Sequence, residues 1–221
     1  MCILKVKQMK AKQIITLMIA CTAMLLMTSC LNDSESNSNY TYEPYTTAEK
    51  AAKLLNMQGS YSGQIYYNIN TATGKYDSTT VSAVITATDS LVRFTNVPME
   101  VFTSGLDSRY KDSVKVNTVL PVLEATLHIY LPWGYNKSDL GDGCYYQIFP
   151  KSWQASTMID FNGKQKLCTI VFEQTNTAYS SIGYYSKDWF KCNLVVKSVT
   201  IQGSINEYTM HAPLGIALKK Q

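Results

Sequence analysis

Histidine is scarce in this chain, and the familiar catalytic motifs are missing. Its two histidines are His128, in an expected strand without neighbouring ligands at metal-site spacing, and His211, in an expected loop. No Gly-x-Ser-x-Gly, His-Glu-x-x-His or Gly-rich phosphate loop occurs. The segment 136–143 is a poor calcium loop, because Leu140 interrupts its oxygen ligands and no glutamate closes it. We therefore expect a protein that is not an enzyme and needs no metal and no cofactor.

An excess of positive charge is also lacking once the N-terminal stretch is set aside. The formal net charge of +4 comes from Lys5, Lys7, Lys10 and Lys12. Beyond residue 29 the chain has sixteen basic and sixteen acidic side chains. A protein that binds nucleic acid needs a basic face, so this balance argues against nucleic acid as a partner.

The apolar run Ile14–Met27 is too short to span a membrane, which takes about 20 apolar residues. It follows the four lysines and precedes Thr28-Ser29-Cys30, which is the order of a secretion signal. Residues 27–30 resemble the end of bacterial lipoprotein signals (aliphatic, small, small, Cys), with Met27 where leucine is usual. The resemblance implies that residues 1–29 are a signal peptide and that Cys30 becomes an N-terminus carrying palmitate or similar chains. An ordinary cleaved signal with an unmodified Cys30 is the alternative.

Residues 30–45 are expected to form a lipidated N-terminus and a flexible tether. The stretch 31–39 is rich in serine and asparagine and too polar to bury a core. Leu31 resembles an outer-membrane sorting signal, and Asp33 with Glu35 resembles the surface-export signals of some Gram-negative gut anaerobes. These resemblances imply an outer-membrane lipoprotein that faces the periplasm or the cell surface and has the membrane as its partner through the lipid anchor.

Few cysteines remain beyond the expected signal. Cys144, Cys168 and Cys192 are odd in number, so at least one is free or paired between molecules. Their spacing is too wide for a zinc site. We interpret all three as buried thiols, with a disulfide between two of them as the alternative. The sequence indicates no oligomeric state.

Residues 46–221 have the composition of a single β-rich domain, with many Thr, Tyr, Val and Ile residues. Thr46 and Glu49 are spaced as in a capping box and predict a short N-terminal helix that ends at Gln58-Gly59. Alternating apolar residues then predict strands, beginning with 60–70 and 80–88. Eight to ten such strands favour an antiparallel barrel or β-sandwich.

Asn162-Gly163 is the strongest hairpin signal in the chain, because a type I′ turn needs positive φ at both positions. A two-residue turn there places Phe161 opposite Lys164. The same register turns Cys168 toward the core.

The segment Gly59–Gly63 resembles the first strand of small calycin-like barrel lipoproteins from Gram-negative gut anaerobes, which are of uncharacterised function. The resemblance implies a calycin-like barrel with an apolar interior and no known reaction. If that interior holds an apolar small molecule, a large cavity should be lined by Tyr61, Ile65, Ile85 and Phe172.

Aromatic residues concentrate in two segments that we expect to be loops. The candidates for ligand contact are Trp133, Tyr135, Tyr145, Tyr146, Tyr184, Tyr185 and Trp189, with Tyr179 nearby. Aromatic side chains on loops of a rigid β scaffold give a large contact area at low entropic cost, which suits stacking on sugar rings. In the alternative interpretation they only cover the ends of the barrel.

These patterns predict a cell-envelope lipoprotein that binds a ligand without converting it, the ligand being an apolar small molecule or a glycan. Two other roles stay open. A structural or assembly component of the outer membrane should show a long open sheet edge. An uncharacterised hydrolase would need carboxylates that meet only in the fold.

Overall fold

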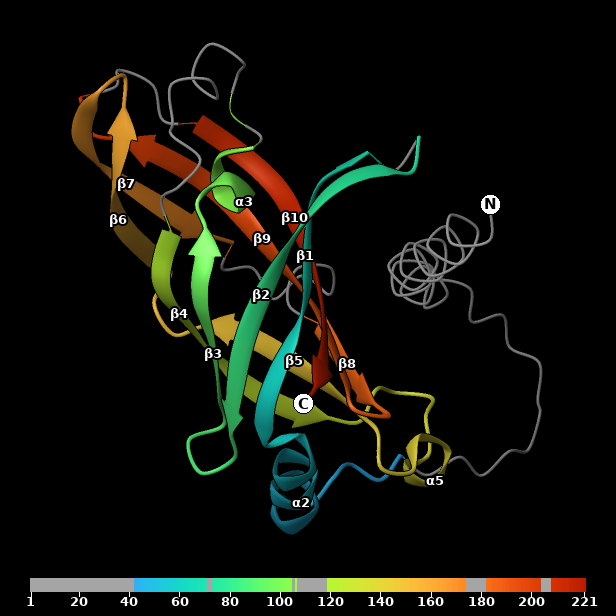
Figure 1. The fold of residues 1–221 in the computed structure, drawn as a ribbon. Coiled ribbons are helices and arrows are strands. Elements are labelled where there is room, and N and C mark those ends of the chain that lie inside the picture. The colour runs from blue at the N-terminus through green and yellow to red at the C-terminus, as the bar shows by residue number, and fades with distance from the viewer. Residues whose placement is uncertain (1–41, 71–72, 105, 107–118, 174–181, 204–207) are drawn as a thin grey trace. The chain divides into compact units, whose positions relative to one another are not determined.

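Among the described residues the first helix is α2 (Thr47–Met57), which begins with the predicted capping box. The computed structural model describes residues 42–70, 73–104, 106, 119–173, 182–203 and 208–221 (Figure 1). Thr46 Oγ1 accepts a hydrogen bond from Glu49 N (3.2 Å), and Glu49 Oε2 accepts one from Thr46 N (2.7 Å). The helix ends where Gln58 N donates to the Leu54 carbonyl (3.0 Å). The predicted N-terminal helix is therefore confirmed.

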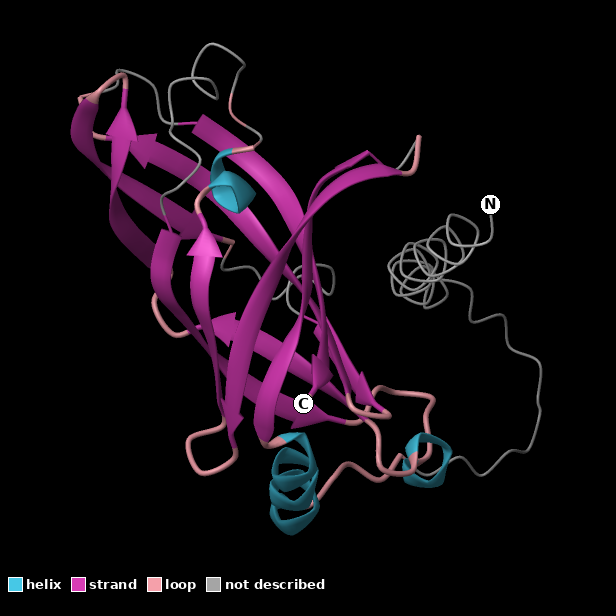
Figure 2. Ribbon diagram, in the orientation of Figure 1, coloured by secondary structure: helices cyan, strands magenta, loops and turns pink. Residues whose placement is uncertain are grey.

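Ten strands follow within the described residues (Figure 2). They are β1 (Gly59–Asn70), β2 (Lys75–Thr86), β3 (Leu91–Pro98), β4 (Val119–Tyr130), β5 (Cys144–Pro150), β6 (Gln154–Phe161), β7 (Lys164–Phe172), β8 (Ile182–Ser186), β9 (Trp189–Ile201) and β10 (Tyr208–Lys220). Eight of them close into an antiparallel barrel in the order β10-β1-β2-β3-β4-β5-β8-β9, and β9 pairs back to β10. The predicted calycin-like barrel is confirmed, and the sandwich alternative is wrong because the sheet closes on itself.

The hairpin of β6 and β7 extends the barrel wall on one side. Asn162 (φ 53°) and Gly163 (φ 75°) form its turn, and Phe161 pairs with Lys164 as predicted. β7 pairs with residues 196–201 of β9, beyond the part of β9 that pairs with β8. The hairpin therefore continues the wall along β9 past the end of β8.

Aromatic rings fill the centre of the barrel. The Phe190 ring stacks on Tyr146 (centroids 5.0 Å apart, planes at 12°) and lies 6.0 Å from Tyr61 and 6.4 Å from Phe94. These four side chains are at most 1% exposed. Gly183 of β8 pairs with Tyr146 of β5, and a Cβ at Gly183 would lie 2.1 Å from the tyrosine ring. Because Gly183 has no side chain, the Tyr146 ring can occupy the space beside it.

Helices close the two ends of the barrel (Figure 1). At one end α2 buries Leu54 and Met57, and Met57 Sδ lies 3.6 Å from Cys144 Sγ. At the other end α3 (Glu100–Thr103) packs against β1, β3 and β9. Its Phe102 ring lies edge-on to Phe172, with centroids 6.1 Å apart. Residues Tyr42–Gln221 form one compact unit.

The three cysteines beyond the expected signal are free and buried, which confirms their interpretation as core thiols. Burial raises the pKa of Cys144 to about 12 and that of Cys168 to about 11, and it also raises the pKa of Cys192. Their thiols therefore stay protonated and unreactive near neutral pH. None of the described helices has the length and apolarity needed to cross a membrane.

Candidate functional site

Four outward side chains lie in register across neighbouring strands of the barrel wall: Tyr130 of β4, Tyr145 of β5, Tyr184 of β8 and Lys191 of β9. The ring centroid of Tyr145 lies 6.4 Å from that of Tyr130 and 4.7 Å from that of Tyr184. Alternation along each strand turns them outward, because their chain neighbours point into the core: Ile129, Tyr146, Tyr185 and Phe190. We call these four residues the tyrosine ladder.

Two further aromatic residues border the ladder. Tyr135, in the loop between β4 and α5 (Lys137–Leu140), brings its ring to 5.6 Å from Tyr145. Trp189 begins β9, and Lys191 Nζ lies 5.7 Å from the centroid of its ring. The ladder and these two side chains form a continuous outer surface.

The expectation that the second aromatic segment is a loop is wrong, because Tyr184 and Tyr185 belong to β8 and Trp189 is the first residue of β9. Trp133 and Tyr135 lie in the loop before α5 as expected, and Tyr145 and Tyr146 lie in β5. The sequence does not indicate β8, because the turn after it is made by Lys187 (φ 50°) and Asp188 (φ 65°) rather than by glycine or asparagine. Tyr179 lies outside the described residues.

Tyr146 and Tyr185 point into the barrel and do not belong to the outer surface that Tyr145 and Tyr184 form. Tyr146 is fully buried, and its hydroxyl donates to the Lys191 carbonyl (2.8 Å). Tyr185 is 5% exposed, and its hydroxyl donates to the Asn56 carbonyl (3.1 Å). In each Tyr-Tyr pair only one ring can face outward, because successive strand residues point to opposite faces.

Sequence reasoning missed part of this surface. Tyr130 and Lys191 belong to the ladder, and the exposed His128 lies two residues before Tyr130 on the same outward face of β4. The His128 ring lies 5.3 Å from Phe149, which in turn lies 6.4 Å from Trp153. The alternation of inward and outward side chains along β4 and β5 is the sequence signal that could have placed these residues on one face.

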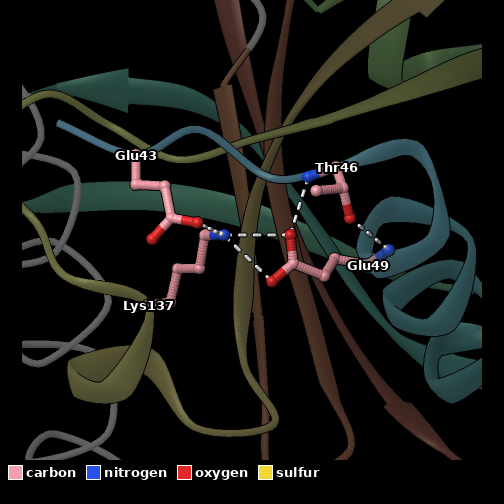
Figure 3. Close-up of polar contacts among 4 residues, drawn as sticks. All are labelled: Glu43, Thr46, Glu49 and Lys137. Carbon is pink, nitrogen blue, oxygen red and sulfur yellow. Dashed lines mark hydrogen bonds and ion pairs between the residues drawn. The ribbon is translucent and has the colours of Figure 1, made fainter.

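An ion-pair cluster fastens the loop of Tyr135 to α2 (Figure 3). Lys137 Nζ lies 3.0 Å from Glu49 Oε1 and 3.2 Å from Glu43 Oε1. The Thr46 backbone N–H, with Lys137 and the Thr46 side chain, lowers the pKa of Glu49 to about 2. The cluster thus joins α5, α2 and the segment before α2.

Replacing Glu49 by glutamine is expected to remove a pH-dependent part of the stability. The folded-state pKa of Glu49 is about 2, against an ordinary value of 4.5. A lowered pKa means that this stabilisation is full above pH 4.5 and is lost as the pH falls toward 2. The difference in unfolding free energy between wild type and Glu49→Gln should be constant above that window and shrink within it, as urea unfolding at several pH values can measure. Glu43→Gln is the matched control, since Glu43 pairs with the same lysine but is 77% exposed. A Glu49→Gln difference that does not change between pH 5 and 2 would contradict the assignment.

An open pocket of about 500 Å³ lies where α2 meets the β8–β9 turn. Its lining is Asn56, Leu140, Asp142, Gly143, Tyr185, Ser186, Lys187 and Asp188. The Tyr185 hydroxyl is already bonded to Asn56, and it also lies 3.5 Å from Asp188 Oδ1. Across the part of the chain that the structure describes, no three His, Cys, Asp or Glu side chains are grouped to hold a metal ion. The ladder is therefore the stronger candidate for a site.

Residues 56–201 match the family model described as "Domain of unknown function (DUF4840)". The chain belongs to this family. No curated protein and no solved structure matches the chain. The DUF4840 match begins within α2 and ends with β9, so it includes all four ladder residues together with Tyr135 and Trp189. The strand β10, which closes the barrel, follows the matched region.

Proposed function

We propose that this protein is a lipid-anchored envelope protein that binds a carbohydrate on the tyrosine ladder without converting it. The observation that carries the proposal is the row of Tyr130, Tyr145 and Tyr184 on the outer wall of a barrel whose core is already filled. Half-buried rings that face outward from a rigid sheet offer apolar area without first having to be ordered.

Polar groups flank the rings at distances that suit a sugar. His128 and Gln147 form the next outward pair of β4 and β5, about 7 Å along the strands from the ladder. Lys191 ends the ladder with an ammonium group. Imidazole, amide and ammonium groups together donate and accept hydrogen bonds, as the hydroxyl groups of a sugar require.

The filled interior favours a carbohydrate on the wall over an apolar molecule inside the barrel. The four side chains expected to line an internal cavity are only 1–2% exposed: Tyr61, Ile65, Ile85 and Phe172. Side chains that faced an empty cavity of ligand size would keep accessible surface. An apolar ligand would therefore have to displace packed rings.

The lipid anchor in this proposal rests on the order of lysines, apolar run and Cys30 at the N-terminus. Two or three acyl chains on Cys30 would hold the protein stably at the outer membrane, since each buried CH₂ contributes about 0.8 kcal/mol. A sugar-binding wall on such a protein would meet carbohydrates at the envelope or cell surface.

An assembly role in the envelope is the second candidate, and one observation favours it. Among the described residues, β6 pairs with β7 alone, so the other edge of β6 faces no hydrogen-bonded strand. An unpaired strand edge can accept a strand from another protein.

Tyr145→Ala is expected to weaken carbohydrate binding at least about tenfold, which corresponds to ~1.4 kcal/mol. Tyr145 touches three other rings, so its loss removes the centre of the surface. The measurement is a screen of soluble neutral and acidic polysaccharides with residues 40–221, followed by titration of the hits.

Tyr76→Ala is the matched control for that screen. Tyr76 pairs with Tyr66 on the β1–β2 hairpin, 5.2 Å between centroids and away from the ladder. Its loss should leave binding unchanged. Equal binding by wild type and Tyr145→Ala, or no polysaccharide bound by wild type, would refute the proposal.

A further inference from the structure

The end of the barrel that α2 closes, opposite the end with α3, is called the helix end below (Figure 1). Three structural elements meet there. The β8–β9 strand pair reaches α2 through Tyr185, whose hydroxyl donates to the Asn56 carbonyl. The α5 segment reaches it through the pairing of Lys137 with Glu49 and through the hydrogen bond from Lys53 to the Gly141 carbonyl.

The outer face of α2 is apolar and exposed. Leu54 and Met57 point into the barrel, whereas the opposite face presents an exposed stripe at i, i+3, i+4 and i+7: Ala48, Ala51, Ala52 and Leu55. Leu55 is 63% exposed. A surface helix of a soluble barrel normally turns polar residues to this side, so the stripe calls for a partner.

Further apolar side chains lie at the same end. Trp133, in the loop before α5, is 73% exposed. Tyr42 is 38% exposed, and its hydroxyl donates to the Leu131 carbonyl (2.7 Å) at the start of that loop. Tryptophan and tyrosine are the residues enriched where proteins meet the boundary between lipid headgroups and acyl chains.

The anchor in the proposed function would bring this end to a bilayer. Twelve peptide steps separate Cys30 from Tyr42, so the chain between them reaches at most about 40 Å. Tyr42 is held at the helix end by its bond to Leu131. A tether this short keeps the stripe and Trp133 at a high effective concentration near the membrane, so that weak contacts are enough.

We infer that the helix end docks on the bilayer that carries the anchor, with Leu55 and Trp133 at the headgroup boundary; this inference rests on the proposed lipid anchor. The docking does not need an anionic lipid, because positive and negative side chains at the helix end are nearly equal in number. The lysines are Lys50, Lys53, Lys137, Lys187, Lys219 and Lys220, and the carboxylates are Glu43, Glu49, Asp139, Asp142 and Asp188. A zwitterionic bilayer is therefore sufficient. Docked in this way, the barrel turns its other end, which α3 closes, away from the membrane.

The test attaches residues 30–221 to phosphatidylcholine vesicles through Cys30 and a maleimide lipid. This chain keeps every described element, and its other three cysteines are buried and protonated. A Trp153→Phe/Trp189→Phe protein retains Trp133 alone. Flotation first confirms that this protein is attached to the vesicles. In vesicles of brominated lipid the Trp133 fluorescence should then fall to about half, because bromine quenches an indole ring that lies at the headgroup boundary. A Trp133→Phe/Trp189→Phe protein, which retains Trp153 near β6, should be unaffected.

Charge variants give a second readout. Leu55→Glu should restore most of the Trp133 fluorescence, whereas Met158→Glu, at a 48% exposed site on β6, should not. Unquenched Trp133, or equal quenching of Trp133 and Trp153, would overturn the docking. Because the maleimide lipid attaches the protein chemically, the quenching of Trp133 does not depend on whether cells acylate Cys30. Variants of the ladder such as Tyr145→Ala should leave the quenching unchanged. A failure of the docking is therefore distinct from a failure of the proposed function.

Discussion

Gly183→Ala is expected to destabilise the barrel by about 3 kcal/mol or more, at or above the upper end of ordinary overpacking. The added methyl would lie 2.1 Å from the Tyr146 ring. That ring cannot move aside, because it stacks on Phe190 and its hydroxyl is bonded to the Lys191 carbonyl. For a domain of this size the melting temperature should fall by about 6–12 °C, which thermal and urea unfolding can measure.

Two comparisons isolate the steric cause. Gly163→Ala adds a methyl where nothing lies within 4 Å, so it reports backbone strain alone (φ 75°) and should cost about 1–2 kcal/mol. Tyr146→Leu removes the ring, so the effects of Gly183→Ala and Tyr146→Leu should combine to much less than their sum. Additive effects, or a Gly183→Ala protein as stable as wild type, would show that the ring adapts.

The short strand β8 links the core to the candidate site. In five residues it turns Gly183 and Tyr185 inward and Tyr184 outward. The contact that holds Tyr146 in the core therefore also fixes the position of Tyr184 in the ladder. A change in the ladder alone, such as Tyr145→Ala, should by contrast leave the core packing intact.

Local signals predicted much of the fold. The capping box of Thr46 and Glu49 and the Asn162-Gly163 turn depend on residues a few positions apart, so both appeared as predicted. Alternation along many strands predicted an antiparallel barrel or β-sandwich, and the pairing of β9 with β10 decides for the barrel. β8 was missed because Lys187 and Asp188 adopt positive φ without the residues that usually signal it.

The ladder could not be predicted because it depends on pairing between strands that are distant in sequence. Tyr145 contacts Tyr184 only because β5 pairs directly with β8, although the β6–β7 hairpin separates the two strands in the sequence. No local pattern predicts that neighbour relation. The aromatic content near Tyr145 and Tyr184 was visible in the sequence, but which ring of each pair faces outward depended on strand direction and on closure of the barrel.

Cys30→Ser is expected to abolish acylation and maturation of the protein. The serine hydroxyl cannot replace the thiol to which the lipid is joined in a bacterial lipoprotein, so the variant should keep residues 1–29 and carry no acyl chain. The readouts are incorporation of labelled palmitate and the intact mass of the protein from the membrane fraction. Wild type should be labelled and should begin at Cys30.

Cys21→Ser is the matched control, because Cys21 lies in the same apolar run but not at the expected cut site. It should be acylated and matured as wild type is. If Cys30→Ser is also cut, and wild type carries no acyl chain, the N-terminus is an ordinary signal. The barrel would then be released as a free protein, and the helix end would have no bilayer held beside it. The contacts of the Tyr145 ring with Tyr130 and Tyr184 join strands of the barrel itself, so we expect the ladder in either case.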